Sequence, residues 1–396
     1  MTAALDSLQF DPGCAEQSTR PDYYDVLRRL RSEAPVHGYA PHRWTVARYD
    51  DVRAVSRDPE RFCSGQGVLL HDPKRDGAEL PGSILHMDPP QHQEWRKVGS
   101  RWFTPRAVAR LEERVRAVVG EVLDEVAPGE PLDVVDALAA PIPVLVIAEL
   151  LGVGDADRSD IRRWSDACIE GAEDSDAAAN MHAVGELLAF LDAHARARRE
   201  RPGDDLLSAL TSAEVEGRAM GGDEVVLYCM SLLVAGNETT RHLLSGSVAL
   251  LAGHPDQRAT LRAEPSLLPG AVEECLRMVT PIQVMVRTAT CDLELGAQAV
   301  AAGDWVVLLY ASANRDEAVF GPDADRFDVT RPANPAHLAF GFGEHLCLGA
   351  SLARLEARAF LEQLLARFPD FTVTGEPTWT RSTLVRGHVS LPAVLA

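Results

Sequence analysis

A proline-free stretch from Asp223 to Gly253 is the feature that most constrains how this chain can fold. Asp223 is a suitable N-cap, Pro255 follows the last residue, and about thirty residues of α-helix would span about 45 Å. The stretch is apolar nearly all round, apart from a polar patch at Gly236–His242. A helix without a polar face is expected to be buried. We therefore predict a central helix with the rest of the chain packed around it.

The remaining sequence reads as mostly helical with a few strands. Asp88-Pro89-Pro90 is expected to open a helix with Asp88 as its cap, because proline is tolerated in a first turn. We find no internal repeat and no break between domains, and predict one domain over residues 1–396, with about 1–20 loose. The fold class is mainly α with a minor β-sheet. The expected elements are a helix at Tyr23–Glu33, strands at Arg43–Tyr49, Val284–Thr288 and Trp305–Tyr310, and a helix after Cys347 with Leu348, Leu352, Leu355 and Ala359 on one face.

Charge and cysteine usage exclude several classes of protein. The formal net charge is −20, whereas nucleic-acid binding calls for a basic face. Seven scattered cysteines without a CxxC pair argue against a zinc site or a disulfide framework and favour a reducing compartment. Residues 1–20 lack a charged region followed by an apolar one, and the most apolar stretch, 141–153, is too short to span a bilayer, so we expect neither a signal peptide nor a membrane anchor. A cytoplasmic protein is expected.

One cysteine lies in a glycine-rich segment, Phe340–Gly349, with the sequence FGFGEHLCLG. Glycines let a backbone approach a flat ligand closely. The helix that follows Cys347 favours an anionic sulfur through its first N–H groups and its dipole. A thiolate on haem iron favours O–O cleavage. A structural cysteine in a turn is the alternative for a lone Cys, but the full pattern favours a haem ligand.

This segment resembles the haem-binding signature of the cytochromes P450, and each fixed position of that signature is filled. The resemblance runs from about Tyr23 to Leu391. It implies a P450 fold that holds haem b between the long central helix and the Cys-loop helix, with Cys347 as the ligand to iron. The residues that it places at the cofactor are His92, Arg96, Ala235, Gly236, Arg287, Phe340, Gly341, His345, Cys347 and Gly349. Of these, His92, Arg96, Arg287 and His345 are implied to bind the propionates.

Two further motifs stand in the order that the family shows. Glu274 and Arg277 share a helix face at i and i+3, a spacing that alone is more typical of a solvated surface pair. The resemblance gives them a structural role in assembling the haem pocket. Glu238 and Thr239 lie in the polar patch of the long helix, where a buried carboxyl needs a partner, unless the patch faces solvent. The resemblance makes them the acid–alcohol pair that delivers protons during O₂ activation.

The implied function is a monooxygenase that uses O₂ and inserts one oxygen atom into a large, mostly apolar substrate of steroid, terpenoid or fatty-acyl type. The alternative is a tailoring hydroxylase or epoxidase of a polyketide or carrier-bound natural product. No GxGxxG follows a strand, so NAD(P)H would act through an external ferredoxin and reductase, with Arg96, Lys97, Arg101, Arg354 and Arg358 as a docking face. The candidate substrate contacts, each equally compatible with plain core, are Leu69, Ile84, Leu85, Val234, Asn237, Ile282, Val284, Met285 and Leu384.

Two rival functions are disfavoured by the acid–alcohol pair. A peroxide-driven peroxygenase of the resembled family carries Arg-Pro in place of Glu238-Thr239. A haem sensor without turnover would need no proton relay.

Overall fold

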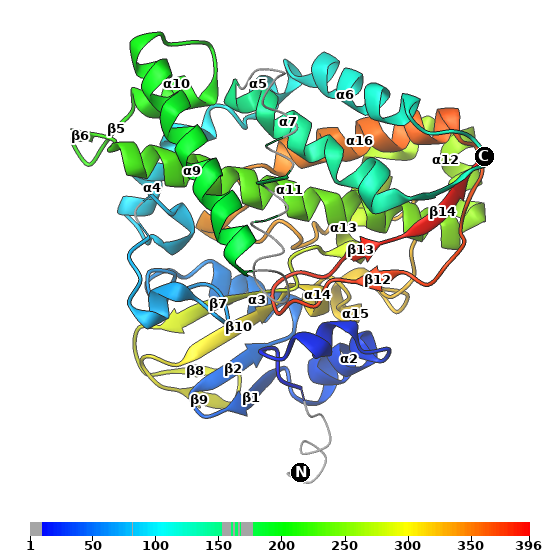
Figure 1. The fold of residues 1–396 in the computed structure, drawn as a ribbon. Coiled ribbons are helices and arrows are strands. Elements are labelled where there is room, and N and C mark those ends of the chain that lie inside the picture. Colours follow the sequence, from blue (N-terminus) through cyan, green and yellow to red (C-terminus); the bar gives the residue numbers. More distant parts are fainter. Residues whose placement is uncertain (1–9, 81, 153–159, 161–162, 165–166, 168–176) are drawn as a thin grey trace. The chain divides into compact units, whose positions relative to one another are not determined.

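The computed structural model describes residues 10–80, 82–152, 160, 163–164, 167 and 177–396 (Figure 1). The chain divides into two compact units. The first unit comprises residues 1–79, 254–347 and 378–389, and the second unit comprises residues 80–253, 348–377 and 390–396. No helix in the described part is long and apolar enough to cross a bilayer. The single domain expected over 1–396 stays a prediction, and residues 1–9 of its expected loose start lie outside the described residues.

The first unit is built on a five-stranded sheet in the order β1-β2-β10-β7-β3. Its central strand β10 is buried along Val306–Leu309, because apolar clusters pack on both faces of the sheet. Strand β10 runs parallel to β2 and antiparallel to β7. The strands are β1 (Val36–Ala40), β2 (Arg43–Val46), β3 (Phe62–Cys63), β7 (Val284–Ala289), β10 (Trp305–Leu309) and the pairs β8 (Leu293–Leu295) with β9 (Gln298–Val300) and β12 (Thr378–Trp379) with β13 (His388–Ser390). The α-helices are α2 (Tyr23–Glu33), α3 (Tyr49–Ser56), α12 (Pro255–Ala263), α13 (Leu268–Val279), α14 (Tyr310–Ala313) and α15 (Glu317–Phe320).

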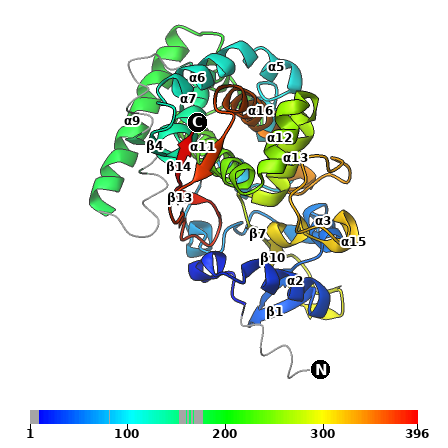
Figure 2. The ribbon, with the colours of Figure 1, turned by 90° about the vertical axis from the view of Figure 1, so that its right-hand side faces the viewer.

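The second unit is organised around the long helix α11 (Gly222–Gly253). Helices α7 (Pro141–Leu151), α9 (Ala177–Glu200) and α16 (Ala350–Arg367) pack around it (Figure 2), which confirms the predicted central helix within this unit. The other helices are α4 (Gln91–Ser100), α5 (Pro105–Ala109), α6 (Glu112–Asp124), η4 (Val135–Ala139) and α10 (Leu206–Thr211). The strands are β4 (Pro131–Asp133), β11 (Phe371–Val373) and β14 (Pro392–Leu395) in one sheet, and the pair β5 (Glu214–Val215) with β6 (Arg218–Ala219).

The boundaries of several predicted elements differ from the structure. Strand β2 ends at Val46 because Tyr49 already begins α3, where its N–H donates to the Asp316 carboxylate at 2.9 Å. The expected cap at Asp88 is wrong, since α4 begins after Pro90 and no side chain caps it. Asp223 lies inside the first turn of α11 rather than at its cap, where its charge still suits the helix dipole. Leu348 precedes α16, so it is not on the helix face assigned to it.

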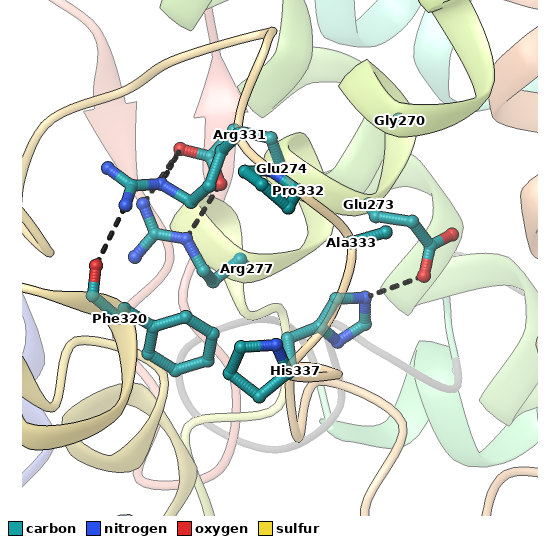
Figure 3. Close-up of a pocket in the computed structure, with 10 residues that line it drawn as sticks. Gly270, Glu273, Glu274, Arg277, Phe320, Arg331, Pro332, Ala333 and His337 are labelled. Carbon is teal, nitrogen blue, oxygen red and sulfur yellow. Dashed lines mark hydrogen bonds and ion pairs between the residues drawn. The ribbon is translucent and has the colours of Figure 1, made fainter.

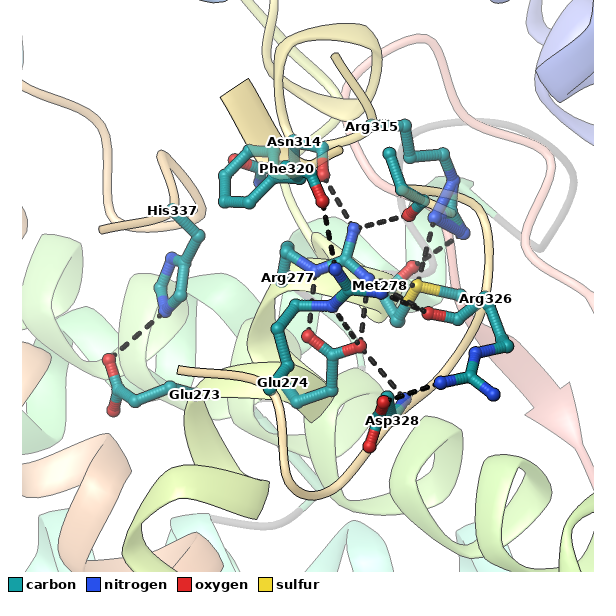
Figure 4. Close-up of polar contacts among 12 residues, drawn as sticks. Glu273, Glu274, Arg277, Met278, Asn314, Arg315, Phe320, Arg326, Asp328 and His337 are labelled. Atoms are coloured by element: carbon teal, nitrogen blue, oxygen red, sulfur yellow. Dashed lines mark hydrogen bonds and ion pairs between the residues drawn. The ribbon is translucent and has the colours of Figure 1, made fainter. Parts of the chain in front are cut away.

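A buried ion pair on α13 organises the loop that leads to Cys347 (Figure 4). Nε and Nη2 of Arg277 each donate to one oxygen of the Glu274 carboxylate at 2.7 Å, and each side chain is only 2% exposed. The remaining hydrogen-bonding groups of both side chains find partners in the loop formed by residues 314–331. Arg277 donates to the carbonyls of Asn314, Ala324 and Arg326, and Glu274 accepts from the Asp328 N–H and from Arg331. The predicted pair therefore exists, and it is not on the surface.

We expect Arg277→Met to destabilise the protein by about 3–5 kcal/mol, because it leaves the Glu274 charge buried without its main partner. Urea unfolding followed by circular dichroism measures the change. The matched control is Arg28→Met, which breaks the exposed 2.7 Å pair with Asp25 and should cost less than about 1 kcal/mol. Equal losses in the two variants would contradict the role assigned to the buried pair.

Candidate active site

The Cys347 loop depends on two glycines with left-handed backbone. Gly341 and Gly343 have φ values of 70° and 76°, and a Cβ atom at Gly343 would collide with the carbonyl oxygen of Ser56. Only glycine fits such a position without strain. The N–H of Cys347 donates to the Phe340 carbonyl at 2.8 Å, which closes the loop, and the cysteine is exposed. The loop therefore presents one sulfur at the surface of the first unit.

Two of the basic side chains expected at the cofactor belong to the first unit, Arg287 on β7 and His345 within the loop itself. Arg287, on β7, is 4% exposed and donates to the Val286 carbonyl at 2.9 Å. Within the described ranges, no carboxylate lies within 4 Å of its guanidinium. A buried cation without a counter-ion favours an anionic ligand. His345 has its Nε2 3.1 Å from the Ser64 hydroxyl and 3.5 Å from the Glu344 carboxylate.

The second unit carries the acid and the alcohol on α11. The Thr239 hydroxyl donates to the Ala235 carbonyl at 2.8 Å, so its oxygen lone pairs stay available as acceptors. Glu238 is 16% exposed, and its Oε1 lies 3.7 Å from Nε2 of His242. Ala235 is exposed, and a Cβ atom on Gly236 would meet nothing within 4 Å. The helix is continuous here, and its open flank suits a flat ligand.

His92 and Arg96 lie one turn apart on α4, also in the second unit. His92 is 1% exposed and Arg96 is partly buried. Because both belong to α4, their spacing of i and i+4 puts them on one helix face. Their expected role toward an anion stays a prediction.

These observations test whether the chain fits a haem. In the first unit, an exposed cysteine in a glycine-built loop and a buried guanidinium without a carboxylate partner at Arg287 suit a thiolate-ligated, dianionic cofactor. In the second unit, the open flank beside Gly236 suits a flat ligand. Each unit by itself is therefore compatible with the cofactor that the sequence implies.

The candidate substrate contacts divide between the two units. In the first unit, Val284 belongs to an apolar core cluster, and Ile282 and Met285 pack against another; Leu69 and Leu384 are half-buried. In the second unit, Ile84 and Asn237 are buried, Val234 is half-buried and Leu85 is 39% exposed. Their roles as substrate contacts stay predictions.

A pocket of the first unit is too small to hold an organic substrate (Figure 3). It is lined by side chains that include Glu273, Glu274, Arg277, Arg331 and His337, and it has room for about one water molecule. His337 accepts from the Ala339 N–H at 3.1 Å through Nδ1, and its Nε2 lies 3.2 Å from Glu273. The pocket lies beside the Glu274–Arg277 ion pair, since both of these residues line it.

Sequence reasoning missed two buried titratable groups. Glu356 on α16 is 3% exposed, and burial raises its pKa to about 8. It lies four residues after Leu352, so helical spacing already places it on the apolar face. His242 is fully buried and lies four residues after Glu238. The same spacing could have identified it as a neighbour of the acid.

Comparisons with known proteins identify the family. The family model described as Cytochrome P450 matches residues 176–384. The chain is 41% identical to the cyclomarin C epoxidase CymV of Salinispora arenicola, covering 89% of this chain and 90% of that protein. It is 38% identical to a methyl-branched lipid omega-hydroxylase of Mycobacterium tuberculosis, covering 92% of this chain and 89% of that protein.

A solved structure shares the fold at similar sequence identity. The Mycobacterium marinum cytochrome P450 CYP268A2 in complex with pseudoionone superposes with a TM-score of 0.88 at 35% identity, covering 96% of this chain and 97% of that one. The mainly helical fold with small sheets is that of this family. The chain belongs to the cytochrome P450 family of monooxygenases, which use haem, O₂ and electrons from outside the chain.

Proposed function

We propose that this chain is a haem b monooxygenase in which Cys347 is the thiolate ligand to iron. The observation that carries the proposal is the exposed Cys347 sulfur on a loop that two left-handed glycines shape. Arg287 and His345 from the first unit and His92 and Arg96 from the second would hold the propionates. When bound, the haem supplies O₂ activation and oxygen transfer to the substrate.

The chain's own contribution to the reaction is the control of protons at α11. Because its hydroxyl hydrogen is engaged by the Ala235 carbonyl, Thr239 Oγ1 would accept a hydrogen bond from a water molecule and hold it in place. The partly exposed Glu238 carboxylate would take up a proton on its solvent side and release it to that water. This pair disfavours both the peroxide-driven and the non-catalytic alternatives.

Electrons would come from NAD(P)H through an external reductase and a ferredoxin. The basic residues expected to dock the ferredoxin in the second unit are Arg96, Lys97, Arg101 and Arg354. Arg358 would add less net positive charge to this docking face, since its guanidinium is paired with the Glu112 carboxylate at 3.0 Å. The scattered cysteines support a cytoplasmic setting.

The substrate that we propose is large and mostly apolar, of steroid, terpenoid or fatty-acyl type. The candidate contacts are nearly all aliphatic, and each methylene that they bury contributes about 0.8 kcal/mol. The relative that is named a methyl-branched lipid hydroxylase supports this class. The relative that is named a cyclomarin C epoxidase supports the second candidate, a tailoring enzyme of a natural product.

We expect Cys347→Ser to abolish the thiolate-type band of the reduced carbon-monoxide complex, because a hydroxyl cannot replace the thiolate. Absorbance spectra of the holoprotein measure this band. The controls are Cys229→Ser and Cys275→Ser, both of which alter buried cysteines and should keep it. Loss of the band in either control, with retention in Cys347→Ser, would reverse the assignment.

We expect Thr239→Ala to bind haem normally but to divert reducing equivalents to peroxide. The missing hydroxyl would leave the proton-carrying water unplaced, which harms O–O cleavage more than O₂ binding. Product formed per NADPH oxidised is the measurement. Unchanged coupling in the variant would show that Thr239 has no such role.

We expect sterols, terpenoids or fatty acids to shift the ferric haem toward high spin. A spectral titration with cholestenone-like compounds, fatty acids and macrolactones separates the two substrate classes. If a macrolactone shifts the spectrum and no lipid does, the tailoring function replaces the lipid function.

A further inference from the structure

His242 is a polar side chain in an environment that gives it almost nothing to bind. It is 0% exposed, and neighbouring Leu243, Leu244 and Ser245 on α11 are buried as well. Neither ring nitrogen has a hydrogen bond among the residues that the structure describes. Buried polar groups nearly always have a partner, because leaving one unsatisfied is costly. If this side chain only filled space, leucine would do so without the cost of burying polar atoms that lack a partner.

The nearest charged group on the same helix face is the proposed proton carrier. Nε2 of His242 lies 3.7 Å from Oε1 of Glu238, about 0.5 Å beyond the longest ordinary N–H···O hydrogen bond. The carboxylate torsion of glutamate is broad, so a small rotation closes this gap. Burial lowers the pKa of His242, opposed by Glu238 and assisted by Arg241. The ring is therefore neutral near pH 7 and has one N–H to donate.

We propose that His242 is a positioning residue for the monooxygenase reaction, whose Nε2–H holds the Glu238 carboxylate in the orientation from which it passes protons toward Thr239. This inference rests on the proposed function and adds one residue to it. The three side chains form a sequence along α11, in which a buried donor restrains a partly exposed acid next to the alcohol. Without the donor, the carboxylate samples other orientations and supplies protons less often.

The test measures the fate of O₂ in the substrate-free holoenzyme, supplied with NADPH, a plant-type ferredoxin and its reductase. Hydrogen peroxide released per O₂ consumed reports poor proton supply, because full reduction to water needs more protons. We expect His242→Phe to raise the peroxide share and to slow NADPH oxidation on the order of 10-fold, less than the loss of the acid itself. His242→Gln, which keeps an N–H donor, should recover most of the original behaviour.

A double-mutant cycle separates positioning from simple structural damage. If His242 acts through Glu238, then His242→Phe should change the peroxide share less than about twofold in a Glu238→Gln background. Ser247→Ala is the matched control, since Ser247 is buried on α11 and donates to the Leu243 carbonyl at 2.7 Å. It should leave the peroxide share unchanged. If His242→Phe does not retain haem, His242→Leu takes its place.

Two results would overturn the proposal. One is an unchanged peroxide share in His242→Phe, and the other is the same increase in both backgrounds. A holoenzyme without the thiolate-type carbon-monoxide band would instead refute the proposed function. An unaltered peroxide share in Glu238→Gln would refute the proton-carrying role of Glu238 and with it the positioning role of His242.

Discussion

The buried ion pair between Glu274 and Arg277 is the interaction on which the first unit depends. Both charges are withdrawn from water, so each needs several partners to offset its desolvation. Those partners are backbone groups between Asn314 and Asp328, and this fixes the path of a loop that has little regular structure. Asn314 extends the restraint, because its side chain donates to Thr280 and accepts from the Leu338 N–H at 2.6 Å. The constraint reaches the residues that lead into the Cys347 loop.

A different constraint governs the second unit. Helix α11 is mostly apolar, so placing a carboxylate and a hydroxyl near its centre costs free energy unless each finds a partner. Thr239 lowers that cost by bonding back to the Ala235 carbonyl. Glu238 remains partly exposed and approaches His242. The polar groups that oppose the apolar pattern of this helix are thus the ones to which we assign a role in the proposed reaction.

Much of the architecture could be predicted because it follows from local periodicity. The bounds of α2 are those expected, and β7 and β10 differ by one residue each. The start of α4 was misplaced because capping depends on backbone geometry that the residues around Asp88 do not reveal. The burial of Glu274 and Arg277 also could not be predicted from their spacing in the sequence. Their spacing suits a surface pair equally well, and only the loop around Asn314, distant in sequence, withdraws them from water.

The roles of the candidate site residues stay predictions, and the residues differ in how far the sequence alone indicates them. Cys347 stands in a glycine-rich pattern whose chemistry is local, whereas the acid–alcohol role of Glu238 and Thr239 came from the family resemblance. Arg287 and His92 needed the family resemblance, since a lone basic residue has no distinctive sequence context. His242 and Glu356 required burial to be known, because helical spacing shows which face a residue occupies but not what covers it.

X-ray absorption at the iron edge of the purified holoprotein tests the central claim most directly, since it reports which elements bind iron. The account predicts a sulfur atom bound to iron in the unmutated protein and its loss in the Cys347→Ser variant. Iron bound only by nitrogen and oxygen in the unmutated protein would contradict it.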